Sequence, residues 1–243
     1  DRVTRHGSWV ATTATSEQVN GEKAQALWTG MPLRTHRRCD EPMFTVANRI
    51  AYADQMVYGR VDKMGQPQPA PFSCILGESA WMNVQATRSQ HPVIDEELDV
   101  LVDRLRELQR QPAFTPPAQA GERTKPAKIF VISPFRKVKN ACIARLKKAG
   151  LSGIECGTVH TFQGKEAEIV FLVLGTAPGQ AGAGARAWAS GKPNLLNVAI
   201  TRAKHLLYVI GDAAQWGELA HFAELLRALP LRATASTTQD EVE

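Results

Sequence analysis

Five short apolar runs, separated by segments with helical periodicity, constrain the fold of this chain more than any other feature of its sequence. The runs are residues 80–84, 129–132, 157–159, 169–174 and 206–210. All but the first are nearly unbroken, which is typical of strands that are covered on both faces. Strands that alternate with helices favour a mostly parallel sheet. We therefore predict an α/β domain with a central sheet between two helical layers.

The segments between the runs carry apolar residues three and four positions apart, as amphipathic helices do. The clearest is residues 98–108, which follow an acidic cluster at residues 95–97, and acids are favourable at the start of a helix. Two segments are expected to be loops: residues 111–126, with four prolines, and residues 176–193, rich in glycine and alanine. The second is either a functional loop or a plain surface connection.

The composition, with 44% hydrophobic and 22% charged residues, is close to that of average folded domains. No apolar run approaches the roughly 18 residues of a membrane span, so we expect no membrane partner. The four cysteines are far apart, which argues against a zinc site or disulfides and favours the cytoplasm. The net charge of +5 is compatible with a polyanion partner but is common in proteins that bind none. The chain starts without Met or a signal sequence, which suggests a piece of a longer protein.

Residues 157–166 (GTVHTFQGKE) contain more hydrogen-bonding groups than a plain loop needs. Gly164 permits close approach of the backbone to a ligand, and Glu166 can accept from a sugar hydroxyl. Three further residues offer donors to phosphate oxygens: Thr158, His160 and Thr161. Each of these residues taken alone is a weak indication, and a histidine in a loop is more often structural than a ligand.

Residues 194–204 (NLLNVAITRAK) predict a helix with a packing stripe on one face. Val198 and Arg202 are four positions apart and share another face. An arginine among so many small and apolar residues is not expected to be loosely solvated. Its planar guanidinium suits phosphate oxygens and stays charged when it is removed from water.

Residues 33–44 (LRTHRRCDEPMF) place several arginines just before an amphipathic stretch. Such a density of arginine before a helix either cradles an anion or forms ion pairs on the surface. The pattern by itself does not decide between the two.

Together these segments resemble motifs of the superfamily 1 helicases of the Upf1/DNA2-like group. Residues 158–166 resemble motif V, which grips the nucleic-acid backbone and reaches the nucleotide, and residues 197–204 resemble motif VI with its arginine finger. Residues 33–43 resemble the segment with a second ATP-sensing arginine, and residues 131–136 (VISPFR) resemble motif IV. The four occur in family order.

This resemblance implies that Arg202 is the arginine finger and that Arg38, rather than Arg37, is the earlier arginine. The residues expected to face the nucleotide are Gln163, Gly164, Lys165 and Glu166. Those expected to face the nucleic-acid backbone are Ser133, Pro134, Phe135, Thr158, His160 and Thr161. Phe135 stands where tyrosine is commoner in the family, which leaves stacking possible but removes a hydroxyl.

The family's fold implies a RecA-like three-layer αβα domain of the P-loop NTPase type, the second of two that clamp ATP and Mg²⁺ between them. We expect residues 1–32 to be a lead-in from the preceding motor domain, residues 33–230 to be the RecA-like domain, and residues 231–243 to be a flexible tail. The implied partners are single-stranded DNA or RNA and an N-terminal RecA-like domain of the same parent protein.

The phosphate loop of a complete motor, Gly-x-x-x-x-Gly-Lys-Ser/Thr, does not occur in this sequence. Neither Gly191-Lys192 nor Gly164-Lys165 has the required spacing and following residue. Residues 93–96 (VIDE) resemble a magnesium-binding strand end, but Pro92 and the helical sequel favour a helix start. An arginine finger accelerates hydrolysis only when phosphates and metal are already positioned. We therefore expect another domain to bind ATP and Mg²⁺, and this chain alone to be inactive.

Two other functions remain open. The chain is alternatively a non-catalytic nucleic-acid-binding or interaction module that kept a RecA-like fold, since one fold can host several functions. A small-molecule enzyme is disfavoured because the sequence has no dinucleotide glycine fingerprint and no nucleophile with a paired base. Both alternatives retain the predicted fold.

Overall fold

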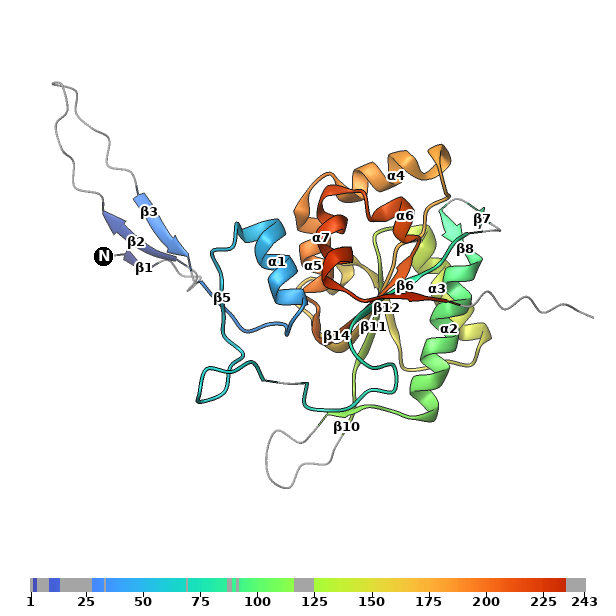
Figure 1. Ribbon diagram of the computed structural model, residues 1–243, viewed down its shortest axis with the longest axis horizontal. Helices are drawn as coiled ribbons and strands as arrows, with labels where there is room; N and C mark the ends of the chain where they lie inside the picture. Colours follow the sequence, from blue (N-terminus) through green and yellow to red (C-terminus); the bar gives the residue numbers. More distant parts are fainter. Residues whose placement is uncertain are drawn as a thin grey trace, which may run out of the picture.

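The computed structural model contains a central sheet of six strands, all of them parallel (Figure 1). The strand order is β12-β11-β13-β14-β6-β15. The strands are β6 (Ala80–Asn83), β11 (Ile129–Ser133), β12 (Glu155–Thr158), β13 (Ala167–Val173), β14 (Ala203–Gly211) and β15 (Leu231–Ala233). The structure describes residues 2–3, 9–13, 28–32, 34–68, 70–86, 89–90, 92–115 and 125–234.

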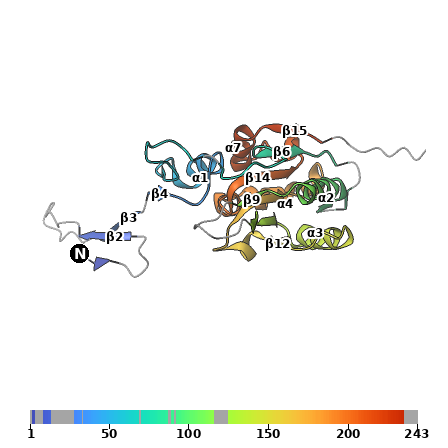
Figure 2. The same ribbon diagram turned by 90° about the horizontal axis from the view of Figure 1, so that it is seen from below.

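Helices cover both faces of this sheet. The helices are α1 (Met43–Tyr52), α2 (Asp95–Arg110), α3 (Arg136–Lys148), α4 (Gln180–Ser190), α5 (Pro193–Ile200), α6 (Ala213–Trp216) and α7 (Ala220–Ala228). One core cluster joins α1, α5, α6 and α7 to the sheet, and a second joins α2 and α3 to its other face. Figure 2 shows α2 and α3 together on one side, with α1 on the other. The predicted three-layer αβα architecture with a mostly parallel central sheet is confirmed.

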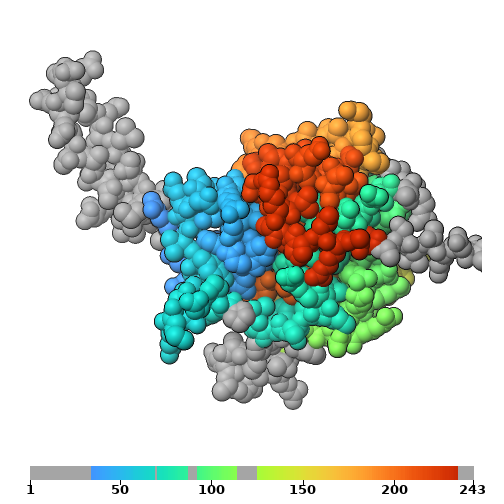
Figure 3. All heavy atoms as spheres, viewed as in Figure 1, coloured from blue at the N-terminus to red at the C-terminus, as the bar shows by residue number. Residues whose placement is uncertain are grey.

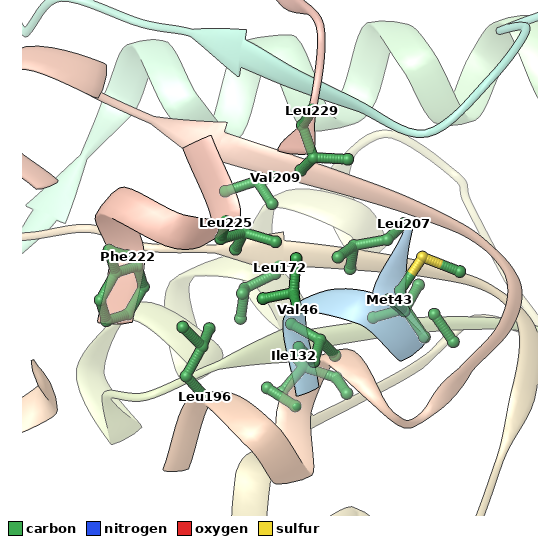
Figure 4. Packing of buried hydrophobic residues seen from close by; sticks show 14 of the residues in the cluster. Met43, Val46, Ile132, Leu172, Leu196, Leu207, Val209, Phe222, Leu225 and Leu229 are labelled. Carbon is green, nitrogen blue, oxygen red and sulfur yellow. The ribbon is translucent and has the colours of Figure 1, made fainter. Parts of the chain in front are cut away.

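The two core clusters explain why the apolar runs are unbroken. In β13, Val170 and Leu172 pack into the first cluster, while Ile169, Phe171 and Val173 pack into the second. Figure 4 shows Leu172 among side chains from α1, α5, α7 and β14. Successive side chains of a strand point to opposite faces, so a strand covered on both sides needs apolar residues at every position.

Most predicted elements are confirmed, with shifted bounds. The helix after the acidic cluster is α2, which begins at Asp95, so residues 93–96 are a helix start as expected. The predicted strand at residues 157–159 is β12, but it ends at Thr158, and Val159 begins the 3₁₀ helix η1 (Val159–Phe162). Strand β15 continues the sheet three residues beyond the expected domain boundary at residue 230.

The prediction of a loop at residues 176–193 was wrong, because the segment contains α4. Alanine has the highest helix propensity of all residues, and its repetition here outweighs the cost of the glycines. Gly182 in this helix is needed for packing, since a Cβ would lie 2.0 Å from the carbonyl oxygen of Ala177. The composition that suggested a loop is therefore that of a closely packed helix.

Within the described ranges, short strands outside the central sheet form four small sheets. Strands β1 (Arg2–Val3), β2 (Trp9–Thr13) and β3 (Trp28–Pro32) form an antiparallel sheet in the expected lead-in, most of which lies outside the described residues. The other three are pairs: β4 (Thr35–His36) with β5 (Val57–Tyr58), β7 (Ser89–Gln90) with β8 (Val93–Ile94), and β9 (Phe114–Thr115) with β10 (Lys125–Pro126). The last pair belongs to the expected loop at residues 111–126, and residues 235–243 of the expected tail are not described.

Candidate functional site

The parallel sheet has an amino edge, where its strands begin, and a carboxyl edge, where they end. Glu166 directly precedes β13 and Arg202 directly precedes β14, and these two strands are neighbours. Ser133 ends β11 and Thr158 ends β12, and these two residues are paired in register. The structure therefore places residues predicted to face the nucleotide at one edge and residues predicted to face nucleic acid at the other.

Arg202 is 4% exposed, as the small and apolar residues around it predicted. Its Nε donates to the carbonyl of Val198 at 3.1 Å, and its Nη1 donates to the carbonyls of Phe162 at 3.3 Å and Lys165 at 2.8 Å. Burial lowers the pKa of Arg202, and the nearby charge of Arg38 lowers it further. Nη2 makes no hydrogen bond to any residue that the structure describes, so it is the nitrogen left for a ligand.

Arg38 is exposed, but the residues that follow it are anchored in the core. Cys39 is fully buried, and the backbone N–H of Asp40 donates to the carbonyl of Lys204 at 2.9 Å. A carboxylate oxygen of Asp40 lies 2.6 Å from Nδ1 of His205. The segment with Arg38 is thus attached to the start of β14, directly beside the position of Arg202.

The carboxylate of Asp40 has two further partners, the guanidinium of Arg60 and the hydroxyl of Tyr58, which donates at 3.3 Å. Burial by itself would raise the pKa of Asp40. The hydrogen bond with His205 and the charge of Arg60 outweigh burial and hold this pKa below its ordinary value. Asp40 is therefore a charged buried carboxylate that joins β5, β14 and the arginine segment.

The crossover from β12 to β13, residues 159–166, runs from the carboxyl edge back to the amino edge. Its last four residues are exposed: Gln163, Gly164, Lys165 and Glu166. Gly164 has a φ of +84°, and a Cβ there would meet no atom within 4 Å, so the backbone is open to a ligand. The two carbonyl bonds from Arg202 hold this crossover against the end of α5.

At the carboxyl edge the predicted residues differ in their accessibility. Ser133 is 1% exposed, and its Oγ accepts from the backbone N–H of Phe135 at 3.2 Å, while Pro134 is also buried. Phe135 is half-buried and packs against both core clusters. In this conformation Ser133 and Pro134 shape the turn and are not available for direct contact.

Thr158, at the end of β12, and Thr161, in the crossover, are more accessible. Thr158 is half-buried, His160 and Thr161 are exposed, and the hydroxyl oxygens of the two threonines lie 3.1 Å apart. One hydroxyl hydrogen occupies this contact, which leaves the other for an acceptor such as a phosphate oxygen. These three residues form the accessible polar part of the carboxyl edge.

Several neighbours of the candidate site residues escaped prediction from the sequence. Asp40 lies two positions after Arg38, and His205 lies three positions after Arg202. The available signal was a polar residue, His205, near the start of an otherwise apolar strand. Nδ2 of Asn197 donates to the hydroxyl of Tyr52 at 3.2 Å, which connects α5 to the end of α1. Within the described residues, no cluster of three His, Cys, Asp or Glu side chains could hold a metal ion.

The described residues thus form a parallel α/β domain with two arginine segments at one edge of its sheet. The sequence profile of a family described as "AAA domain" matches residues 25–214, and the chain belongs to this family. This match, together with the relative described next, confirms the resemblance to helicases of the Upf1/DNA2-like group.

A stretch of 107 residues is 34% identical to the DNA replication ATP-dependent helicase/nuclease DNA2 of Bos taurus. It covers 43% of this chain and 10% of that protein. A solved structure, the C-terminal domain of a possible DNA helicase from Lactobacillus plantarum WCFS1, is 12% identical with a TM-score of 0.43, over 81% of this chain and 99% of that chain. No helix in the described part of the chain is long and apolar enough to cross a membrane.

Proposed function

We propose that this chain is the second motor domain of an ATP-dependent helicase or translocase. In this proposal Arg202 and Arg38 act on ATP that is bound mainly by another RecA-like domain, while the carboxyl edge binds a single strand of DNA or RNA. The observation that carries the proposal is the attachment of the Arg38 segment to β14 beside Arg202, because it brings two distant arginines to one edge of the sheet.

The amino edge has the chemistry that the phosphate end of ATP requires. Charge develops on the transferred phosphoryl group, and guanidinium groups aimed at it act mainly when that charge appears. Nη2 of Arg202 and the exposed Arg38 are the groups that meet this charge. In this proposal Mg²⁺ is held by the partner domain, where it neutralises the phosphates.

The carboxyl edge supports binding that does not depend on sequence. Thr158, His160 and Thr161 offer hydrogen bonds suited to phosphate oxygens, and such contacts position a strand without reading its bases. The crossover from β12 to β13 begins at these residues and ends at Glu166 beside the arginines. One short segment therefore links the proposed strand-binding edge to the proposed ATP edge.

A second candidate function is a non-catalytic nucleic-acid-binding module. It is favoured by the bonds that Arg202 makes to three carbonyls, since an arginine engaged in this way can serve the fold alone. The two functions differ in what the loss of Arg202 does to ATP turnover.

The test uses the full-length parent protein with its phosphate-loop domain. Arg202→Ala should lower kcat for ATP by on the order of 10² or more, while ATP affinity and single-strand binding stay within about an order of magnitude. Arg202→Lys should restore little, because a flexible ammonium cannot reproduce the planar fork. The exposed Arg37 provides the matched control, and Arg37→Ala should turn over ATP normally.

Combining Arg202→Ala with Arg38→Ala should cost less than the product of the two single losses, as expected for groups that act as a unit. Near-normal turnover in Arg202→Ala, together with lost strand binding, would place Arg202 on the strand-binding side and contradict the proposal.

A further inference from the structure

Trp188, on α4, is the most exposed aromatic side chain of the described residues, with 60% of its surface accessible. The two other tryptophans with described side chains, Trp81 and Trp216, are 0% and 1% exposed. An indole left in water forgoes the stabilisation of burial, roughly 25 cal/mol for each Å² of apolar surface. Figure 3 shows α4 (orange) at the surface, beside α7.

A series of aromatic rings connects the indole of Trp188 to the core. The ring centroid of Phe135 lies 5.9 Å from that of Trp188 and 6.5 Å from that of Trp216, and the rings of Trp216 and Phe222 are 4.6 Å apart. Trp188 is therefore the outermost ring of a series that reaches into the core. One side of the indole rests on Phe135, and much of the rest is free to receive another flat group.

Local hydrogen bonds to the preceding loop and one buried residue hold the helix that carries Trp188. Nη1 of Arg186 donates to the carbonyl of Ala177, and its Nη2 donates to the carbonyl of Gly179, both at 2.6 Å. Ala189, next to Trp188, is 1% exposed. Because the backbone is fixed and an indole has two rotatable bonds, holding the ring in a stacked position costs little conformational entropy.

The surrounding charge is suited to a polyanion. Residues 133–154, which include Phe135 and α3, contain six Lys and Arg residues and no Asp or Glu. Residues 176–201, which include α4, contain two basic residues and again no acid. Arg145 is paired with Asp95 and Asp99, whereas no acid of the described residues forms an ion pair with the other five cations of α3, which can therefore attract phosphates.

We propose that Trp188, supported by Phe135, is a stacking platform for a base of single-stranded nucleic acid. The proposal rests on the proposed binding of a strand at the carboxyl edge, where Phe135 directly follows the Ser133-Pro134 turn. Stacking on an aromatic side chain accepts every base, since every base has a π-face. The platform adds affinity for bases to an edge that otherwise contacts only the backbone.

The experiment compares two fluorescent strands of equal length and charge, oligo(dT) and an abasic deoxyribose-phosphate strand, by anisotropy at low salt. Trp188→Ala should bind oligo(dT) about 10-fold more weakly, the size of one stacked base, and should bind the abasic strand as the unmodified chain does. Trp188→Phe should stay within about threefold, because a phenyl ring still stacks. Ile143→Ala, at a 44% exposed apolar residue of α3, is the matched control and should change neither affinity.

Unchanged affinity of Trp188→Ala for oligo(dT), or an equal loss with both strands, would overturn the platform. Failure of the unmodified chain to bind either strand would contradict the proposed function itself, so the two failures are distinguishable. Thermal unfolding of each variant identifies any loss of affinity that comes from a damaged fold.

Discussion

Asp40 and His205, both buried, are joined by a 2.6 Å hydrogen bond that connects the Arg38 segment to the strand that follows Arg202. His205 is the third residue of β14, and Asp40 lies just before α1, so the bond ties two segments that are distant in the chain. The ring of Phe72 contacts His205 edge-on, with centroids 5.5 Å apart, which fixes the imidazole further.

Asp40→Asn should destabilise the chain at neutral pH by about 3 kcal/mol, because removing one charge of a buried pair leaves Arg60 without its counter-charge. The pKa of Asp40 is lowered in the folded state, so its contribution is present above the unfolded pKa of about 3.9 and is lost as pH falls through the folded value. The difference between Asp40→Asn and the unmodified chain should therefore shrink below about pH 4. Urea unfolding at neutral and acidic pH measures it.

The control for this experiment is Asp103→Asn, at an exposed residue with a 3.9 Å ion pair on α2, which should cost less than about 1 kcal/mol. Equal losses of stability in the two variants would mean that the carboxylate of Asp40 does not hold the Arg38 segment on β14.

Glu97 on α2 is 2% exposed, and burial raises its pKa to about 8 despite a hydrogen bond from the backbone N–H of Gly175. A carboxyl with a raised folded pKa binds its proton more tightly in the folded state, so the chain should lose stability as pH rises from about 4.5 to about 8. Glu97→Gln should flatten this dependence, because the amide remains neutral and can still accept from Gly175. Denaturant midpoints across this range measure the effect, with exposed Glu218→Gln as a control that should leave the slope unchanged.

The chain alone should show no nucleic-acid-stimulated ATP hydrolysis, since its sequence contains no phosphate loop. The measurement is steady-state phosphate release with and without single strands, on protein purified until the rate no longer changes. Release at the rate of a working helicase, abolished by Arg202→Ala, would show that the chain completes an ATP site by itself.

Single-strand binding by the chain should be weak and should fall with salt, with a log–log slope of about −0.7 for each neutralised phosphate. The physical reason is that the accessible groups of the carboxyl edge contact phosphates and release counterions. A fluorescence titration over a range of salt concentrations gives the slope, and a slope near zero would remove the electrostatic basis of the proposed binding.

The sequence predicted the layers of the fold because apolar runs report burial directly. Five of the six sheet strands correspond to such runs, whereas β15 (LRA) has no run and depends on its pairing with β6. Helix α4 escaped prediction because alanine and glycine occur in loops as well as in tightly packed helices. Gly182 is required in this helix because it lies close to Ala177, and this contact exists only in the folded chain.

The burial of Arg202 was predictable from the sequence, but the contacts of the candidate site were not. The small neighbours of Arg202 indicated its burial, yet they did not reveal that carbonyls of the β12–β13 crossover accept its hydrogen bonds. Asp40 and His205 carry no signature that links them across the chain. Periodicity reports which side chains are buried, and it does not report which distant polar groups meet.

The hydrogen bonds from Arg202 to the carbonyls of Phe162 and Lys165 hold the crossover in position. Nη1 cannot donate to both carbonyls and at the same time join Nη2 in a bidentate contact with a phosphate. Under the proposed function, a phosphate bound to Nη2 alone leaves the crossover in place, whereas a phosphate bound to both nitrogens competes with the crossover for Nη1. In the second case, ATP binding would weaken the hydrogen bonds that hold the crossover, which contains His160 and Thr161, and release of phosphate would restore them.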